Sequence, residues 1–252
     1  GLVQTANTFA DEKISVSIPS ELLQRIEKNL SYVYPHKQAT IAPSKLTATQ
    51  LKGRVKDQEV AENTNDASSA AKWRRPGEAI AIKKATDRGN AYHTVMHYID
   101  YAACNNDEQI RNELLRLMDA GHISQEQLAV LDVGKFSALF ATQIGKKLQN
   151  SGHILREFKF SVLKDSAEYL SELQGEKILL QGVVDCAIIE ETGITVIDFK
   201  TDYVTQETVS QRTEDYRNQV EAYAGALERI FKKPVVEKLL YYFQLNQFVS
   251  ID

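Results

Sequence analysis

Apolar residues recur with helical spacing through much of the first 150 residues of the chain. Apolar side chains that recur at this spacing indicate a helix with one buried face. The first helix is expected to have Ser20 as its N-cap and to end before Pro35. The segments predicted to be helical are 19–34, 87–103, 107–120, 124–131 and 133–149, with a short helix capped by Thr47 within 42–54.

Residues 56–78 interrupt this pattern, because they lack apolar periodicity and are rich in Asn, Asp, Ser and Ala. Such a composition predicts a flexible loop. We expect the ring of Trp73, which lies within the loop, to anchor its end on the core. The alternative is that this ring stacks on a nucleobase.

Beyond residue 152 the pattern changes to the alternation and the short apolar runs that are typical of strands. A tight hairpin turn is expected at 190–193. Strands are predicted over 153–163, 177–190, 193–200 and 236–245, with a long helix over 213–232. Helices followed by β-β-β-α-β predict an α/β core with a mixed sheet, preceded by a helical subdomain.

The same pattern predicts how the chain is organised. Residues 1–55 are expected to be an N-terminal helical or connecting segment, and 56–78 the loop. Residues 79–252 are expected to form one domain, with a helical part at 79–150 and an α/β core at 151–252. The chain begins without Met, so we expect it to be a fragment or a processed chain.

Composition limits the classes of protein to which the chain can belong. It is 43% hydrophobic and 25% charged, as a soluble globular protein is. It has no apolar run long enough to span a membrane and no secretory signal. Two cysteines exclude a disulfide framework and a four-cysteine zinc or iron–sulfur site, and they suit a reducing cytoplasm. With a net charge of −4, a nucleic-acid role needs local positive charge, bound cations or delivery by a partner.

Three residues in the predicted sheet form a candidate site. Asp198 and Lys200 are two apart in one strand and so project from the same face. The hairpin can bring Asp185 beside Asp198. Acids in apolar strands are costly unless they are paired or bind metal, and carboxylate oxygens favour Mg²⁺ or Mn²⁺. Such a cation would activate water and polarise a phosphate. The alternative is a simple buried ion pair.

Four more residues are candidates for the same site. Glu157, in the preceding strand, offers another carboxylate, or else a solvated edge charge. Gln219 and Tyr223 share one face of the long helix and could hydrogen-bond the lysine or a phosphate. His93 could ligate a divalent metal, although a lone helical histidine is more often a satisfied core residue.

These residues follow one another in an order that resembles the PD-(D/E)xK nuclease superfamily, and more narrowly its RecB-type domains. The motifs are G-x-x-x-H (Gly89, His93), G-x-x-D (Gly182, Asp185), D-x-K (Asp198, Lys200) and Q-x-x-x-Y (Gln219, Tyr223). Across about 42–245, apart from the loop at 56–78, the chain is most similar to the C-terminal nuclease domain of A subunits of AddAB (RexAB) helicase–nucleases.

The resemblance implies the PD-(D/E)xK restriction-endonuclease-like fold and a role for each candidate. His93, Asp185, Asp198 and the Phe199 carbonyl would bind Mg²⁺, and Lys200 would be catalytic. Three further side chains would support the site or contact DNA: Glu157, Gln219 and Tyr223. The resemblance implies no iron–sulfur cluster here, because four cysteines are lacking.

The resemblance also implies a partner and a process. The chain has no phosphate-binding G-x-x-x-x-G-K-[ST] loop, so an ATP-driven helicase motor is expected elsewhere in the full-length protein, with a B-type partner subunit. The expected function is exonucleolytic cleavage of DNA during double-strand break repair and recombination in the bacterial cytoplasm. The alternatives are a freestanding phage- or CRISPR-type nuclease and a silent scaffold that binds DNA or a partner.

Overall fold

The structure is a computed structural model that describes residues 19–34, 40, 44–51, 76–168 and 176–252. Most of the predicted loop, with Trp73, and the helix stop at Pro35 lie outside these residues. The chain divides into two units, residues 1–42 and 43–252.

The first unit contains helix α1, Ser20–Leu30, all of whose residues are exposed. The prediction that Ser20 is the N-cap is wrong, because the cap is Pro19, whose carbonyl accepts hydrogen bonds from the amides of Leu22 and Leu23. The helix also ends four residues before the predicted 34, at Leu30.

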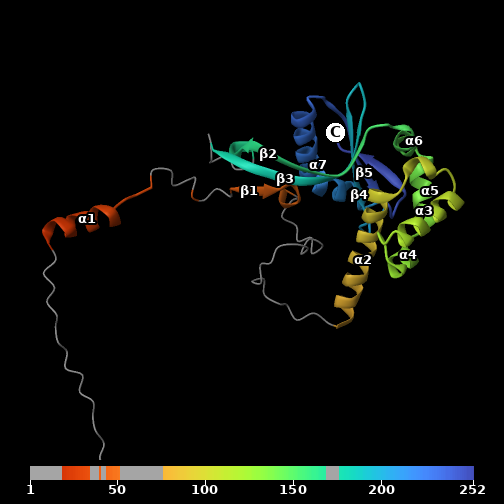
Figure 1. The fold of residues 1–252 in the computed structure, drawn as a ribbon, viewed down its shortest axis with the longest axis horizontal. Coiled ribbons are helices and arrows are strands. Elements are labelled where there is room, and N and C mark those ends of the chain that lie inside the picture. The colour runs from red at the N-terminus through yellow and green to blue at the C-terminus, as the bar shows by residue number, and fades with distance from the viewer. Residues whose placement is uncertain (1–18, 35–39, 41–43, 52–75, 169–175) are drawn as a thin grey trace, which may run out of the picture. The chain divides into compact units, whose positions relative to one another are not determined.

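The second unit is built on a six-stranded mixed sheet (Figure 1). The strand order is β1-β3-β4-β5-β6, and β2 pairs with β3. The β1–β3 and β4–β5 pairs are parallel and the others antiparallel. The strands are β1 (Lys45–Thr47), β2 (Ile154–Asp165), β3 (Lys177–Ile189), β4 (Ile194–Lys200), β5 (Val235–Tyr242) and β6 (Gln247–Ser250).

The four strands predicted from the sequence are confirmed, and two further strands were not predicted. Strand β5 ends at Tyr242, three residues before the predicted end at 245, because the chain turns there, with Asn246 in a left-handed backbone of φ 53°, and then returns as β6. The helix predicted within 42–54 is a single turn, η2 (Ala48–Leu51). As expected, Thr47 caps it through a 3.3 Å hydrogen bond from the Gln50 amide.

The helical part contains more elements than the sequence predicts. They are α2 (Pro76–Tyr98), η3 (Tyr101–Ala103), α3 (Asp107–Asp119), α4 (Gln125–Val130), α5 (Val133–Ala141) and α6 (Gln143–Asn150). The prediction of one helix over 87–103 is wrong at both ends. Residues 76–78 of the predicted loop are helical, and Asp100 caps η3 as a separate turn.

The predicted helix 133–149 is broken at Thr142, whose hydroxyl accepts a 2.9 Å hydrogen bond from the Gly145 amide and so starts α6. A Cβ atom at Gly145 would lie 2.1 Å from the Leu139 carbonyl oxygen. Only glycine permits this close approach of α6 to the end of α5.

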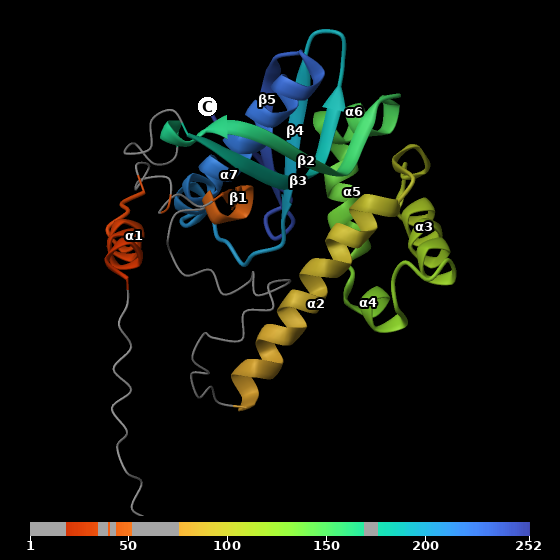
Figure 2. The ribbon, with the colours of Figure 1, turned by 60° about the vertical axis from the view of Figure 1, so that its left-hand side comes forward.

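Helices cover both faces of the sheet (Figure 2). On one face lies α7 (Val209–Phe231), which begins before the predicted residue 213. The buried side chains between α7 and the sheet form the α7-side core, which includes Leu180, Val184, Ala187, Val196, Tyr216 and Val220. The α2-side core lies on the other face and includes Tyr92, Met96, Phe136, Cys186, Ile197 and Phe199.

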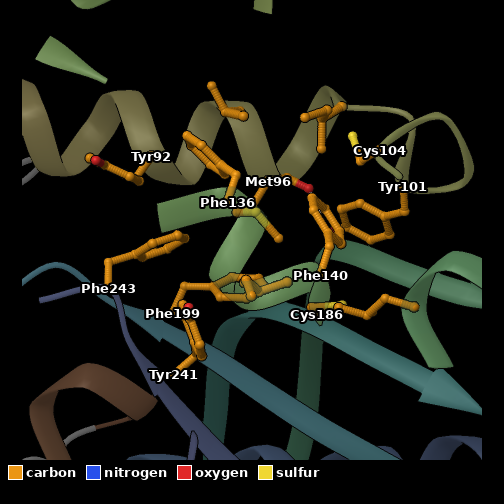
Figure 3. Close-up of a cluster of buried hydrophobic side chains, with 14 of the residues drawn as sticks. Tyr92, Met96, Tyr101, Cys104, Phe136, Phe140, Cys186, Phe199, Tyr241 and Phe243 are labelled. Atoms are coloured by element: carbon orange, nitrogen blue, oxygen red, sulfur yellow. The ribbon is translucent and has the colours of Figure 1, made fainter. Parts of the chain in front are cut away.

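The α2-side core fixes α2 over the sheet (Figure 3). The Tyr92 ring stacks on the Phe136 ring, with 5.1 Å between the ring centroids, and packs against the Phe243 ring, with 4.6 Å between the centroids. Phe199 of β4 contacts the same Phe243 ring at 6.0 Å. Because Tyr92 is anchored in this way, the next residue, His93, has a defined position relative to β4.

Candidate active site

Regular strand alternation places Asp198 and Lys200 on the α7 side of β4. Ile197 and Phe199 point into the α2-side core, so the residues between and beyond them point the other way. The Lys200 Nζ atom lies 2.6 Å from Asp198 Oδ2. Both residues are buried, at 7% and 1% exposure. The sequence-based prediction that the two side chains project together is confirmed.

Two side chains on one face of α7 contact the Lys200 ammonium, and a third contacts one of these two. The ammonium donates to Gln219 Oε1 at 3.5 Å and lies 3.7 Å above the Tyr216 ring. The Gln219 amide donates to the Tyr223 hydroxyl. Spacings of three and four residues bring Tyr216, Gln219 and Tyr223 to the same helix face. Sequence reasoning found the last two and missed Tyr216, although it lies on this face by the same rule.

Burial keeps both tyrosines neutral. It raises the pKa of Tyr223 well above its ordinary value, and the Asp198 carboxylate adds to the effect. It also raises the pKa of Tyr216, whose hydroxyl donates to Asp202. At neutral pH the Tyr216 hydroxyl therefore donates to Asp202, and the Tyr223 hydroxyl accepts a hydrogen bond from Gln219.

Asp185 occupies a point where β3 changes the faces to which its side chains point. Leu180 and Val184 belong to the α7-side core, and two-residue alternation would continue with Cys186. Cys186 instead belongs to the α2-side core, and Ala187 returns to the α7 side. The alternation therefore shifts by one residue at Asp185.

Strand β2 makes the same shift directly opposite. Leu155 and Phe158, three residues apart, both pack on the α7-side core. The antiparallel register pairs Arg156 with Cys186 and Phe158 with Val184, so Glu157 lies across from Asp185. Glu157 has φ 47°, which is uncommon for a residue other than glycine. Irregularities of this kind re-aim side chains beside functional sites.

Strands β3 and β4 separate at the same place. Their pairing ends at Cys186 and Ile197. Beyond this pair, the amide of Phe199 in β4 donates to Asp185 Oδ2 at 2.9 Å instead of to the β3 backbone. We call this gap between the strands, at Asp185 of β3 and Asp198–Phe199 of β4, the fork. The Asp185 carboxylate thus takes the place of a backbone hydrogen-bond acceptor there.

Helix α2 closes this fork with His93. The His93 Nδ1 atom lies 3.3 Å from Asp185 Oδ2. One donor atom each from His93, Glu157 and Asp185 lies within 4.8 Å of the other two, a separation that a single metal ion can bridge. The structure therefore brings together the three residues that the sequence placed on three different elements.

The electrostatics of the site fit a divalent cation. Asp198 Oδ2 is buried and receives no well-oriented hydrogen bond from the described residues, so only the ion pair with Lys200 compensates it. Burial, and next the Asp198 carboxylate, raise the pKa of Asp185 to about 7, against the opposing effects of His93 and Lys200. Two carboxylates and one ammonium leave excess negative charge. Oxygen donors with one imidazole suit a hard or borderline divalent metal.

Two motif glycines keep the backbone of the site close to its neighbours. A Cβ atom at Gly89 would lie 2.9 Å from Thr201 Oγ1, at the end of β4. One at Gly182 would lie 2.6 Å from the Phe160 ring and 3.1 Å from Ala48. The first contact sets how closely α2 approaches β4, and the second seats η2 and β2 against β3.

The structure places all eight candidate residues within this one region, although their roles remain predictions. For Phe199 it records the amide contact to Asp185, and the predicted metal-binding role of its carbonyl stays a prediction. The residue beside Glu157, Arg156, was not singled out. It donates to backbone carbonyls at the end of α2, and nothing in its sequence position signals these contacts.

No described helix is long and apolar enough to cross a membrane.

Comparison with known proteins gives consistent results. The family model of the PD-(D/E)XK nuclease superfamily matches residues 38–250. The A subunit of the ATP-dependent helicase/nuclease of Thermoanaerobacter sp. strain X514 is 32% identical, over 89% of this chain and 19% of that protein. Its counterpart of the same name from Clostridium botulinum strain Loch Maree is also 32% identical, over 92% of this chain and 18% of that protein. The chain thus spans about a fifth of the length of these relatives.

The observed architecture agrees with this result. The mixed sheet with helices on both faces has the expected α/β fold class, and its motifs lie on the elements predicted for them. The family model covers most of the chain, and the resemblance drawn from the four motifs is confirmed. The chain belongs to the PD-(D/E)XK nuclease superfamily.

Proposed function

We propose that this chain is a divalent-metal-dependent deoxyribonuclease domain that hydrolyses phosphodiester bonds with activated water. The observation that carries the proposal is the convergence of His93, Glu157 and Asp185 at the fork beside the Asp198–Lys200 pair. Membership of a nuclease superfamily supports the class of reaction, and the convergence of these residues supports this region as its site.

The metal would be held by His93, Asp185 and Asp198, with Glu157 and the Phe199 carbonyl completing the set, and we propose Mg²⁺, with Mn²⁺ as a substitute. A divalent cation supplies polarisation of the phosphate and activation of water for attack. The Phe199 amide orients one Asp185 oxygen through its 2.9 Å hydrogen bond. Such outer contacts keep ligand geometry fixed.

Lys200 has the properties of a catalytic cation. Contacts with Asp198, Gln219 and the ring of Tyr216 hold its ammonium in place before any substrate binds. A preorganised charge stabilises the negative charge that develops on the phosphate without a cost of reorganisation during the reaction. Gln219 would hold the ammonium beside Asp198, and Tyr223 would hold the Gln219 side chain in turn.

We further propose that the domain works within a longer protein that carries a helicase motor and acts with a B-type partner subunit in the bacterial cytoplasm. The names of the relatives and their greater length support the motor. The net charge of −4 supports delivery of the strand by another component, because backbone neutralisation alone would call for a basic surface. Both cysteines are free and buried, which suits a reducing compartment.

The decisive experiment measures cleavage of end-labelled single-stranded DNA in Mg²⁺ or Mn²⁺ by the parent, Asp198→Asn and the double variant Asp198→Asn/Lys200→Met. Cleavage by the parent should disappear in EDTA and fall at least about a thousandfold in both variants. The matched control is Glu221→Gln/Lys238→Met. It removes an exposed ion pair of the same 2.6 Å length and should leave the rate unchanged.

A parent that neither cleaves DNA nor binds a divalent ion in calorimetry would contradict the proposal and favour a scaffold. Equal cleavage by the parent and by both site variants would show that the activity resides elsewhere. A circular single strand tests the exonuclease assignment, because an enzyme that requires an end should leave it intact.

A further inference from the structure

Among the described residues, the guanidinium group of Arg156 of β2 contacts the end of α2 and the turn that follows it. Its Nη1 atom donates to the carbonyl oxygens of His97, at 3.1 Å, and Ile99, at 2.5 Å. The centre of its guanidinium group lies 3.6 Å above the Tyr101 ring. No acidic partner within 4.0 Å of this guanidinium is found among the described residues.

These contacts are strong and directional for an arginine. The last carbonyls of a helix have no partner within the helix and carry the negative end of its dipole, so a cation is favourable there. The planar guanidinium also stacks on an aromatic face. The Tyr101 ring is itself fixed, since it is 2% exposed and its hydroxyl donates to the Met96 carbonyl at 2.7 Å. Arg156 therefore joins β2 to α2 through a rigid contact.

The two joined elements supply two of the three clustered donors. His93 lies one helical turn before His97 on α2. Glu157 follows Arg156 directly, with its backbone in the left-handed region, and faces Asp185 across the β2–β3 register. A strained backbone persists only where its surroundings hold it. The contacts of Arg156 hold the residue that precedes Glu157 and also the end of α2 that packs against it.

We infer that Arg156 is a positioning residue that sets the separation of His93 from Glu157 and Asp185, and thereby the affinity of the site for a divalent metal. The inference goes beyond the proposed function, which assigns Arg156 no role, but rests on it for the identity of the site. Arg156 acts through the joined backbones and does not touch the metal. Without it, α2 keeps its core packing through Tyr92 but loses its hydrogen bonds with the Arg156 side chain of β2.

The test is calorimetric titration of metal-stripped protein with Mn²⁺. Arg156→Met keeps an apolar side chain of similar length but loses the donors, and Arg156→Lys keeps the charge. Outer contacts of metal ligands typically contribute about 10- to 100-fold in affinity. We expect the Mn²⁺ Kd to rise about tenfold or more in Arg156→Met and less in Arg156→Lys.

The chain offers a matched control in Arg229. Its Nη1 atom donates to the Leu163 carbonyl at 2.6 Å, so it too joins a helix, α7, to β2, but at the other end of that strand. Arg229→Met should leave the Mn²⁺ Kd within about twofold of the parent value. DNA cleavage supplies a second readout. Saturating Mn²⁺ should restore most of the kcat of Arg156→Met, because the defect lies in metal occupancy.

An unchanged Kd in folded Arg156→Met would overturn the inference, and so would an equal rise in Arg229→Met. If Arg156→Met fails to fold, Arg156→Lys decides by the same comparison with Arg229→Lys. A parent that binds no Mn²⁺ would overturn the proposed function together with this inference. A parent that binds Mn²⁺ with no effect of Arg156 variants would overturn the inference alone.

Discussion

The two halves of the site are built in opposite ways. The α7-side half consists of Asp198, Lys200 and their helix partners, which regular elements place and the core buries. The α2-side half consists of His93, Glu157 and Asp185. The positions of Glu157 and Asp185 depend on a shift in strand alternation and a left-handed backbone. The side chains of His93 and Asp185 are 33% and 14% exposed. Packing fixes the Lys200 ammonium in the α7-side half, whereas the donor atoms of the α2-side half are accessible to a ligand.

The contrast divides the roles that the proposed reaction needs. A catalytic ammonium benefits from a dry, preorganised position, because charge interactions are strongest there. A metal site needs access for the ion and for water. If the two halves differ as their construction implies, substitutions in them should change stability in the absence of metal in different ways.

Lys200→Met should cost the most stability, because it leaves the Asp198 carboxylate buried without its cation. Loss of one partner of a buried pair typically costs about 3–5 kcal/mol. Urea unfolding in EDTA measures this cost, and Asp198→Asn/Lys200→Met should recover most of it. Lys238→Met, which breaks the exposed pair with Glu221, should cost less than about 1 kcal/mol. Equal costs for the two lysine variants would contradict the contrast.

Asp185→Asn should instead increase the stability of the metal-free protein. The pKa of Asp185 is raised to about 7 in the folded protein, so the folded state binds a proton more tightly than the unfolded state does. In EDTA, the carboxyl therefore destabilises the parent increasingly as the pH rises from about 4 to about 7.

Relative to the parent, we expect Asp185→Asn to be of equal stability below pH 4, and more stable by about 1–3 kcal/mol above pH 7. Unfolding free energies measured across this pH range test the expectation. Excess Mg²⁺ should narrow the difference, because it stabilises only the parent. A constant difference across the range would show that Asp185 ionisation is not its source.

Glu157→Asn should give the smallest effect. Asparagine tolerates the left-handed backbone better than glutamate, so the variant should gain up to about 1 kcal/mol over Glu157→Gln. Both variants remove the same charge, which makes the glutamine variant the control for electrostatics. Thermal unfolding in EDTA measures the difference, and no gain would mean that the φ of 47° is not strained.

The sequence predicts the regular half of the site better than the irregular half. Asp198 and Lys200, or Gln219 and Tyr223, need only the period of a strand or a helix to be placed together. The joint position of Glu157 and Asp185 depends on a shift that two strands make at once, and strand periodicity does not show where that shift falls. Only the similarity of the motifs to a family placed His93 beside them.

The fold divides in the same way. Long amphipathic helices and apolar strands were predicted because their periods are local properties of the sequence. The three-residue strand β1 is held by pairing with Leu179 and its neighbours, far along the chain, and no local period marks so short a strand. The break at Thr142 likewise follows from the packing of Gly145 against Leu139, which a helical period does not reveal.

Strand β1 has a consequence for any attempt to produce a shorter version of the protein. A polypeptide that starts at residue 79, where the apolar pattern suggests that a domain begins, would lack Lys45–Thr47 and expose the edge of β3 at Leu179–Gln181. Uncovered strand edges template association between chains. A shortened version should therefore retain the segment from Pro43, or else replace an outward-facing residue at this edge with a charged one to limit aggregation.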